Sequence, residues 1–379
     1  MRFQVKHPDY ALEWTPIDTA SSYNRDKPYL NEPFMNQQVA FDSEYYLSIA
    51  TVGYADPEVS TGEINGEQVP LNYAFLPFYP FLIRLFAFPL RILNLSPIAT
   101  STLAGVIVSA LGALAGMIAL FDLALEELGE EGGLRAAFYL LIFPTGFFLA
   151  MVYTEGLFVG LAFGCLALMQ RKQWLWAILL SVLATLTRAV GVLLVIPLVI
   201  TFARSGQWRQ AGFSRSGVKL LALAILIFAP LLAYLLWRFS YLGQMFQLVE
   251  VNFFGRHFLD PGTLLSGWGR ALLSIIGKNH QAAAYNMLEF SATLFGILAC
   301  IFCFRRYPEV ASFSLAVILI SMMSVYPQGM HRYVLTAPAV FLFLGRLGKN
   351  VAFDRSWATF STLLMGAMAL LYAADMWAG

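Results

Sequence analysis

The sequence predicts an all-α polytopic membrane protein, and its composition is the first reason. Of 379 residues, 59% are hydrophobic and 12% are charged, whereas a typical soluble domain carries about 25% charged residues. The mean hydropathy is +0.66, and a soluble fold of this size could not hide so much apolar surface from water. A net charge of +1 offers no basic face to nucleic acid, so we expect no nucleic-acid partner.

Long apolar runs are the second reason. The chain is almost continuously apolar from Tyr73 to its end, which leaves room for about nine or ten spans of about 20 residues each. Four acidic residues, at positions 126, 127, 130 and 131, separate the second run from the third. We expect spans near residues 73–93, 97–121, 134–151, 153–170, 174–203, 217–241, 286–305, 309–327, 333–348 and 356–376.

A polar, aromatic-rich head precedes these runs. Residues 1–72 contain no run long enough to span and no signal-peptide pattern, and their aromatic side chains are typical of a folded cap at a membrane interface. Residues 42–54 have the spacing of a short helix with Asp42 as its N-cap. We therefore expect two domains: this head, and a multi-span domain over residues 73–379 with a larger polar loop near residues 244–285.

Charge distribution predicts the orientation in the membrane. Basic residues cluster after the fifth run, and such loops face the cytoplasm. Counting spans back from this loop places the head on the non-cytoplasmic side. The pair Arg171-Lys172 then faces away from the cytoplasm, but the run 174–203 is interrupted at residues 187–191, and a broken helix there would change the count. The basic cluster consists of Arg204, Arg209, Arg215 and Lys219.

Two carboxylates at the edge of the apolar region, Asp42 and Glu44, are candidates for proton transfer. A carboxylate in a low-dielectric setting accepts a proton more readily, because burial disfavours its charge. From spacing alone, a solvated N-cap aspartate and a surface glutamate are the better explanation. Ionisable residues inside the apolar runs favour a site, because charge at membrane depth is costly. These residues are Arg84, Glu155, Arg188, His331 and Arg332.

Three blocks of sequence resemble the PIG-V type mannosyltransferases, the GPI mannosyltransferase II family with its bacterial relatives. The first block is FDSEYYLSIATVGY with NYAFLPFYPFLIRL, which resembles the family's first luminal loop and next span. The second is VYTEGLF with LATLTRAVGVLL, and the third is MHRYVLTAPAVFLF. The blocks follow the family's order from about residue 40 to residue 345. We expect a bacterial member.

The resemblance implies a GT-C-like helical bundle whose active site is luminal or periplasmic. It also implies transfer of a sugar from a polyprenyl-phosphate donor to a lipid or glycan acceptor, with mannose as the favoured sugar. Membrane lipids would surround the protein as further partners. Asp42 would be the general base of an inverting reaction, with Glu44 auxiliary. No cofactor is expected, although a divalent cation is left open. From their charge and motif positions we assign Arg188, His331 and Arg332 to the donor phosphate, and Tyr46, Tyr153, Glu155 and Tyr333 to substrate binding.

Two departures from the family pattern stand out. Phe41 precedes the aspartate where the family has tryptophan, and the family's first span before the catalytic loop is missing, which predicts a truncated start. The alternative function is a membrane transporter or lipid flippase that uses an internal polar cavity. A transporter should show an inverted repeat in its hydropathy, and the sequence has none that we detect.

Overall fold

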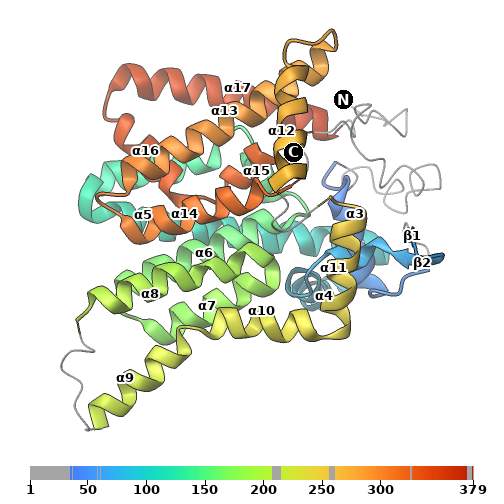
Figure 1. The fold of residues 1–379 in the computed structure, drawn as a ribbon, viewed down its shortest axis with the longest axis horizontal. Helices are drawn as coiled ribbons and strands as arrows, with labels where there is room; N and C mark the ends of the chain where they lie inside the picture. The colour runs from blue at the N-terminus through green and yellow to red at the C-terminus, as the bar shows by residue number, and fades with distance from the viewer. Residues whose placement is uncertain are drawn as a thin grey trace.

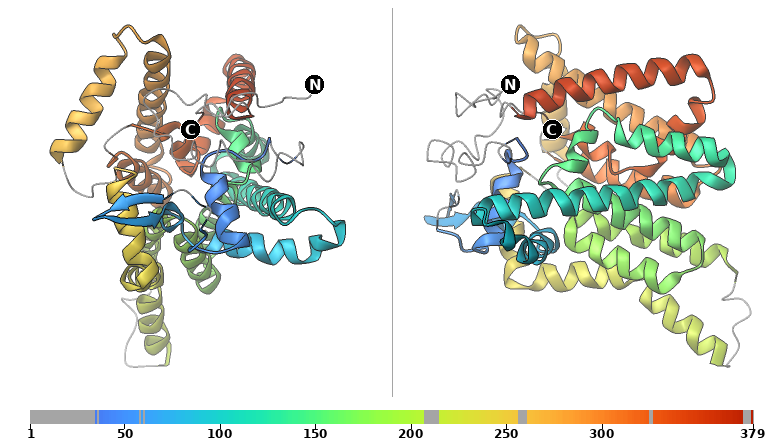
Figure 2. Two further views of the ribbon diagram at one scale, coloured as in Figure 1. Left: turned by 90° about the vertical axis from the view of Figure 1, so that its right-hand side faces the viewer. Right: turned by 180° about the vertical axis from the view of Figure 1, so that it is seen from behind.

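The structure is a computed structural model that describes residues 35, 37–57, 59, 61–206, 215–255, 261–324, 327–373 and 378. Residues 1–34 of the expected head, and Arg209 of the basic cluster, lie outside the described residues. The described part is a bundle of helices with one two-stranded hairpin (Figures 1 and 2). This architecture confirms the expected all-α class.

Several helices coincide with expected spans, and others are interrupted or end within them. In chain order they are α3 (Asp42–Thr51), β1 (Thr61–Ile64), β2 (Glu67–Pro70), η2 (Leu71–Ala74), α4 (Phe78–Leu90), η3 (Arg91–Leu93), α5 (Pro97–Leu141), η4 (Gly146–Ala150), α6 (Thr154–Gln170), α7 (Trp174–Thr187), η5 (Ala189–Leu194), α8 (Val195–Arg204), α9 (Arg215–Leu226), α10 (Ala229–Phe239), α11 (Tyr241–Asn252), α12 (Pro261–Ser274), α13 (His280–Cys303), α14 (Pro308–Ser321), α15 (Met330–Val334), α16 (Pro338–Leu347) and α17 (Val351–Ala373).

The described part of the head lies at one end of the bundle, on the right in Figure 1. Strands β1 and β2 pair antiparallel around Asn65 and Gly66, whose positive φ angles of 54° and 85° suit a tight two-residue turn. The ring of Phe253 packs on the backbone of Gly62, so the segment after α11 lies against the hairpin. The expected loop at 244–285 is therefore largely helical, and α11 forms part of the cap.

Helix α5 reverses direction inside the acidic patch. Its 45 residues are interrupted at Gly129, which has a φ of 68°, a conformation that glycine adopts without strain. After the turn the backbone of Gly133 packs on Phe121, so the second half runs back along the first. The predicted break between the second and third spans is confirmed.

The run 174–203 is a helical hairpin and not one continuous helix. Helix α7 ends at Thr187, Arg188 is extended, and the chain returns through η5 and α8. The ring of Trp174, at the start of α7, lies 6.2 Å from that of Phe202, near the end of α8. The two ends of the run therefore meet.

The reversal of the chain between α7 and α8 removes the conflict between the two groups of basic residues over the orientation in the membrane. Arg171 pairs with Asp122, near the turn of α5, at 2.8 Å, and Arg204 pairs with Glu309, at the start of α14, at 2.7 Å. The C-terminal end of α8, where Arg204 lies, and the turn of α5, close to the partner of Arg171, are at the end of the bundle opposite β1 and β2 (Figures 1 and 2). The expectation that Arg171 and Lys172 face the opposite side from the basic cluster is wrong, because it treated residues 174–203 as one crossing.

Length and apolarity define which helices could cross a membrane. Within the described residues, three helices pass on their own: Pro97–Leu141, His280–Cys303 and Val351–Ala373. A fourth candidate is the pair Gly217–Leu226 and Ala229–Phe239, which is bent by 42°. Five shorter apolar helices accompany them, and the expected number of spans stays a prediction. The shorter helices are Thr154–Gln170, Trp174–Thr187, Ala189–Arg204, Pro308–Ser321 and Pro338–Leu347.

Glycines let α5 and α6 approach each other closely. Gly112 and Gly116 on α5 face Gly156 and Gly160 on α6, and a Cβ added at Gly112 would lie 2.5 Å from the Cα of Leu157. Small residues four apart are the usual means of close helix packing in membranes. This contact fixes the start of α6, and therefore the residues that α6 brings to the site.

We expect Gly112→Ala to destabilise the fold although alanine is the better helix former. The added methyl group would meet the backbone of α6, and overpacking of this kind costs about 1–3 kcal/mol. Gly366→Ala on α17 is the matched control, because a Cβ there meets nothing within 4 Å, and it should be neutral or stabilising. Thermal midpoints of both detergent-solubilised variants test this. Equal shifts in the two midpoints would contradict the packing argument.

Candidate active site

Four charged residues from distant parts of the chain form one ion-pair cluster: Asp42, Glu155, Arg188 and Arg332. Arg332 Nη1 lies 3.1 Å from Asp42 Oδ2, and Arg332 Nε lies 3.5 Å from Glu155 Oε1, as an ion pair that lacks hydrogen-bond alignment. Arg188 Nη1 donates to the same oxygen of Glu155. Since the two carboxylates match the two guanidiniums, the formal charge of the cluster is zero.

Asp42 is the first helical residue of α3, not its N-cap as the sequence predicts. Phe41 holds the N-cap position with a φ of 51°, and it makes no side-chain capping bond. A positive φ is strained for a bulky residue and is typical of functional sites. The Asp42 carboxylate therefore stays available to Arg332, next to the positive end of the helix dipole.

Two tyrosines hold the chain around Asp42. Tyr153 donates its hydroxyl to the carbonyl of Ala40 at 3.1 Å and accepts the Asp42 N–H at 3.3 Å. The hydroxyls of Tyr372, from α17, and Ser43 lie 3.0 Å apart in a hydrogen bond. Tyr153 was expected to bind substrate, but these bonds give it a structural part as well. Tyr372 was missed, since one tyrosine in an apolar run carries no chemical signal.

We expect Tyr372→Phe to slow the proposed transfer reaction several-fold with little loss of stability. The variant keeps the ring and loses the hydroxyl, which bonds to Ser43 and also donates to the carbonyl of Gln38 at 3.5 Å, and a hydrogen bond of this kind is worth about 1 kcal/mol. Tyr139→Phe is the control, since its hydroxyl bonds to Asp354 at 2.5 Å, away from the cluster. Steady-state rates and thermal midpoints test the pair, and an equal slowing of both variants would argue against this part for Tyr372.

Glu155 and Arg188 lie where helices begin and end. Glu155 is fully buried in the first turn of α6, where the helix dipole favours a carboxylate. Arg188 occupies the reversal between α7 and η5, and it also donates to Thr154 Oγ1 at 3.0 Å. The predicted break at residues 187–191 is confirmed, and it is the break that turns Arg188 toward Glu155.

Aromatic rings surround both guanidiniums. The Arg332 guanidinium lies 5.4 Å from the ring of Phe148 and 5.2 Å from that of Tyr153. The ring of Tyr333 lies 5.6 Å from Arg332 and 5.4 Å from Arg188. Tyr333 therefore contacts both cations of the cluster, where the cation–π attraction helps to hold them.

Tyr46 lies one helical turn beyond Asp42 on α3 and is buried. Burial first, and the neighbouring charge of Asp42 next, raise the pKa of the Tyr46 phenol well above its ordinary value. It therefore keeps its proton near neutral pH and can donate a hydrogen bond. Glu44 lies two residues along α3 and is half-buried, and residues at this spacing do not share a helix face.

His331 points to the carboxylate of Glu289, which lies outside the ion-pair cluster. Its Nδ1 lies 2.9 Å from Oε2 of Glu289, as an ion-pair contact without hydrogen-bond alignment. Its Nε2 lies within hydrogen-bond distance, 2.9 Å, of the carbonyl of Ala378. Sequence analysis missed Glu289, although it is an ionisable residue inside an apolar run, the signal that singled out Glu155.

Arg84 caps a helix. Its Nε donates to the carbonyl of Ala50 at 2.8 Å, and its Nη2 donates to that of Ile49 at 3.1 Å. These carbonyls lie at the C-terminal end of α3, where a cation is favoured. The expectation that Arg84 belongs to the internal polar cavity is therefore replaced by a structural function, which anchors α3 on α4.

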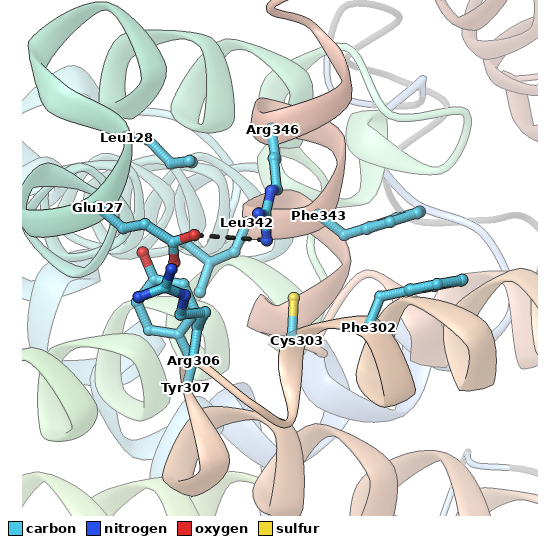
Figure 3. A pocket seen from close by; sticks show the side chains of 9 residues that line it. All are labelled: Glu127, Leu128, Phe302, Cys303, Arg306, Tyr307, Leu342, Phe343 and Arg346. Atoms are coloured by element: carbon cyan, nitrogen blue, oxygen red, sulfur yellow. Dashed lines mark ion pairs between the residues drawn. The ribbon is translucent and has the colours of Figure 1, made fainter.

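A small pocket lies elsewhere, among α5, α13 and α16. Glu127 pairs there with Arg346 at 3.4 Å (Figure 3), near the acidic turn and far from α3 (Figure 1). No residue of the ion-pair cluster lines it. Among the described residues, no group of three His, Cys, Asp or Glu side chains could hold a metal ion. The pocket lining is Glu127, Leu128, Phe302, Cys303, Arg306, Tyr307, Leu342, Phe343 and Arg346.

Comparison with known families identifies the chain. A family model described as "Mannosyltransferase (PIG-V)" matches residues 4–246, more than half of the sequence. The chain belongs to the PIG-V mannosyltransferase family. This membership confirms the expected family, and the helical bundle with its long apolar helices agrees with the expected all-α membrane protein. None of the curated proteins compared with the chain matches it.

Solved structures give weaker likenesses. ArnT from Cupriavidus metallidurans bound to undecaprenyl phosphate has 14% identity and a TM-score of 0.49, over 94% of this chain and 71% of that chain. The Archaeoglobus fulgidus oligosaccharyltransferase AglB, in complex with an inhibitory peptide and a dolichol-phosphate, has 13% identity and a TM-score of 0.44, over 88% of this chain and 50% of that chain. With TM-scores below 0.5, neither likeness bears on the function of this chain.

Proposed function

We propose that this PIG-V family protein transfers a sugar from a polyprenyl-phosphate donor to a hydroxyl group of a lipid or glycan. The sugar that we propose is mannose. The reaction takes place on the non-cytoplasmic side of the membrane and inverts the anomeric centre. The observation that carries the proposal is the ion-pair cluster, in which Arg332 Nη1 lies 3.1 Å from the carboxylate of Asp42. In this cluster the Asp42 carboxylate and the Glu155 carboxylate lie beside two guanidiniums, and this chemistry requires a base next to cations that bind phosphate.

Asp42 serves as the general base. The acceptor oxygen forms a bond to the anomeric carbon while the bond from that carbon to the phosphate oxygen breaks. Asp42 takes the proton of the acceptor hydroxyl, and the electron pair leaves with the polyprenyl phosphate. A lipid phosphate is already an activated leaving group, so the reaction needs no nucleotide. Glu44 remains an auxiliary carboxylate in this proposal.

Arg188 and Arg332 stabilise the leaving phosphate. Guanidinium groups bind phosphate through paired N–H donors. The hydrogen bonds of Arg188 to Thr154 and Glu155 both come from Nη1, which leaves the remaining donors on this partly exposed side chain for the phosphate. The sequence predicts that His331 binds the same phosphate. In this proposal it supports Arg332, which directly follows it along the chain.

Glu155 and the tyrosines bind the sugar. Glu155 Oε2 is buried and has no hydrogen-bond partner among the described residues, and a buried acceptor of this kind is costly unless it is satisfied. A hydroxyl of the donor sugar would supply that donor. Tyr46, Tyr153 and Tyr333 line the same region with their rings.

Depth and orientation agree with a lipid-linked donor. The 14 residues of α7 rise about 21 Å, which is less than the hydrocarbon core of about 30 Å. A helix of this length that starts at one edge of the core ends inside it, so Arg188 would lie within the membrane, where an ionisable residue usually marks a site. Arg171, Lys172 and Arg204 gather at the opposite end, which supports a cytoplasmic face there.

Transfer in proteoliposomes tests the proposal. The purified protein receives radiolabelled polyprenyl-phosphate-mannose or polyprenyl-phosphate-glucose, with octyl mannoside as the acceptor probe. We expect label from the mannose donor to move to octyl mannoside, with release of polyprenyl phosphate. Passage of intact donor across the bilayer without product would support a flippase instead, and transfer from the glucose donor alone would overturn the choice of mannose.

A further inference from the structure

Glu289 of α13 is a fully buried carboxylate that the proposed chemistry does not use. Its Oε1 accepts the N–H of Gly329 at 2.6 Å, and its Oε2 accepts the N–H of His331 at 3.1 Å. Both bonds are made to the backbone that begins α15, the element that carries Arg332. A buried carboxylate within an apolar helix is costly, so its two charge-assisted bonds indicate a function for it.

The segment that Glu289 holds cannot fix its own geometry. Helix α15 has five residues, and a helix this short is unstable on its own. Gly329 enters it with a φ of 77°, a left-handed conformation that favours glycine. Glu289 accepts N–H groups at this start, where a helix has unpaired donors and favours negative charge.

Contacts to the carbonyl and to the ring of His331 also hold the start of α15. Thr145 Oγ1 donates to the carbonyl of His331 at 3.1 Å, and His331 Nε2 lies 2.9 Å from the carbonyl of Ala378. The Nδ1 of the His331 ring lies 2.9 Å from Oε2 of Glu289, so the ring packs directly against the buried carboxylate. Glu289, Thr145 and Ala378 therefore surround His331, and Arg332 is the next residue along the chain.

We propose that Glu289 is a positioning residue for Arg332 and acts through the backbone N–H groups of Gly329 and His331. It fixes the backbone from Gly329 to Arg332, so that the guanidinium reaches Asp42 and Glu155 and meets the donor phosphate. This inference rests on the proposed function. His331 then acts on the phosphate only through Arg332, a finer assignment than its charge alone suggests.

A double-mutant cycle in proteoliposomes tests the inference. The four proteins are wild type, Glu289→Gln, Arg332→Lys and the double variant, with polyprenyl-phosphate-mannose and octyl mannoside as substrates. We expect Glu289→Gln to lower kcat/KM for the donor at least tenfold, while KM for octyl mannoside changes less than twofold. In the Arg332→Lys background the same change should cost less than threefold, because Glu289 acts through Arg332.

The control and the contrary outcomes separate the claims. Glu309→Gln removes a carboxylate whose partner, Arg204, is at the opposite end, and it should leave kinetics unchanged. An equal loss in both Arg332 backgrounds, or no loss from Glu289→Gln, would overturn the inference. If Glu289→Gln does not fold, Glu289→Asp, which shortens the reach of the carboxylate, carries the same comparison. Wild-type protein without transfer activity would instead count against the proposed function.

Discussion

Exchange of Asp42 for asparagine is expected to lower the rate of sugar transfer by about 10²–10⁴-fold, the usual contribution of a general base. Asparagine keeps the size of the side chain but cannot take the acceptor proton. Arg332 keeps its second carboxylate, since its Nε lies 3.5 Å from Glu155. Donor KM should therefore change less than threefold, and single-turnover rates at saturating donor measure the effect.

The matched control for this variant is Asp56→Asn. Asp56 is another aspartate of the head, buried with 8% exposed, and it accepts a hydrogen bond from the hydroxyl of Ser48 at 2.5 Å. Asparagine can accept the same bond, so transfer should stay within a factor of three of wild type. Comparable losses in both variants would mean that the head had unfolded, and an undiminished rate for Asp42→Asn would remove Asp42 as the base.

Arg332→Met is expected to lower both activity and stability. The Arg332 side chain is 7% exposed, and its loss leaves Asp42 without this cation and takes one of two guanidiniums from Glu155. Removal of one partner from a buried ion pair costs about 3–5 kcal/mol. Loss of a preorganised donor at the leaving group lowers kcat about 10²–10³-fold. Thermal midpoints and transfer rates measure the two effects separately.

Arg346→Met is the control for this second prediction. Its side chain is 54% exposed and pairs with Glu127 at 3.4 Å at the opposite end of the bundle. Surface pairs contribute about 0–1 kcal/mol, so both measurements should stay close to wild type. If Arg332→Met behaved like Arg346→Met, the buried ion-pair cluster would have neither the structural nor the catalytic importance assigned to it.

Local signals made much of the fold predictable. The acidic patch between the second and third runs marked the turn of α5, and the interruption at residues 187–191 marked the end of α7. The direction of the chain after Arg188 was not predictable in this way, because it depends on the packing of η5 on α7 and of α8 on α14, which is distant in sequence. This one reversal decides on which side Arg171 lies, so the span count alone led to the wrong side.

The candidate site, like the fold, was predictable from the sequence only in part. Chemistry singled out Asp42, Glu155, Arg188 and Arg332, and the structure brings these four together although Asp42 and Arg332 are 290 positions apart. The sequence alone could not tell these cluster residues from Arg84, which caps α3. That difference depends on which backbone or side-chain group each guanidinium meets.

Transfer of radiolabelled mannose by the purified wild-type protein tests the central claim most directly. Proteoliposomes receive polyprenyl-phosphate-mannose and octyl mannoside, and both the product and its anomeric configuration are determined. Our account predicts a mannosylated octyl mannoside whose new bond has the configuration opposite to that of the donor, together with one polyprenyl phosphate per bond formed. A folded protein that leaves the donor intact, or a product that retains the donor configuration, would contradict it.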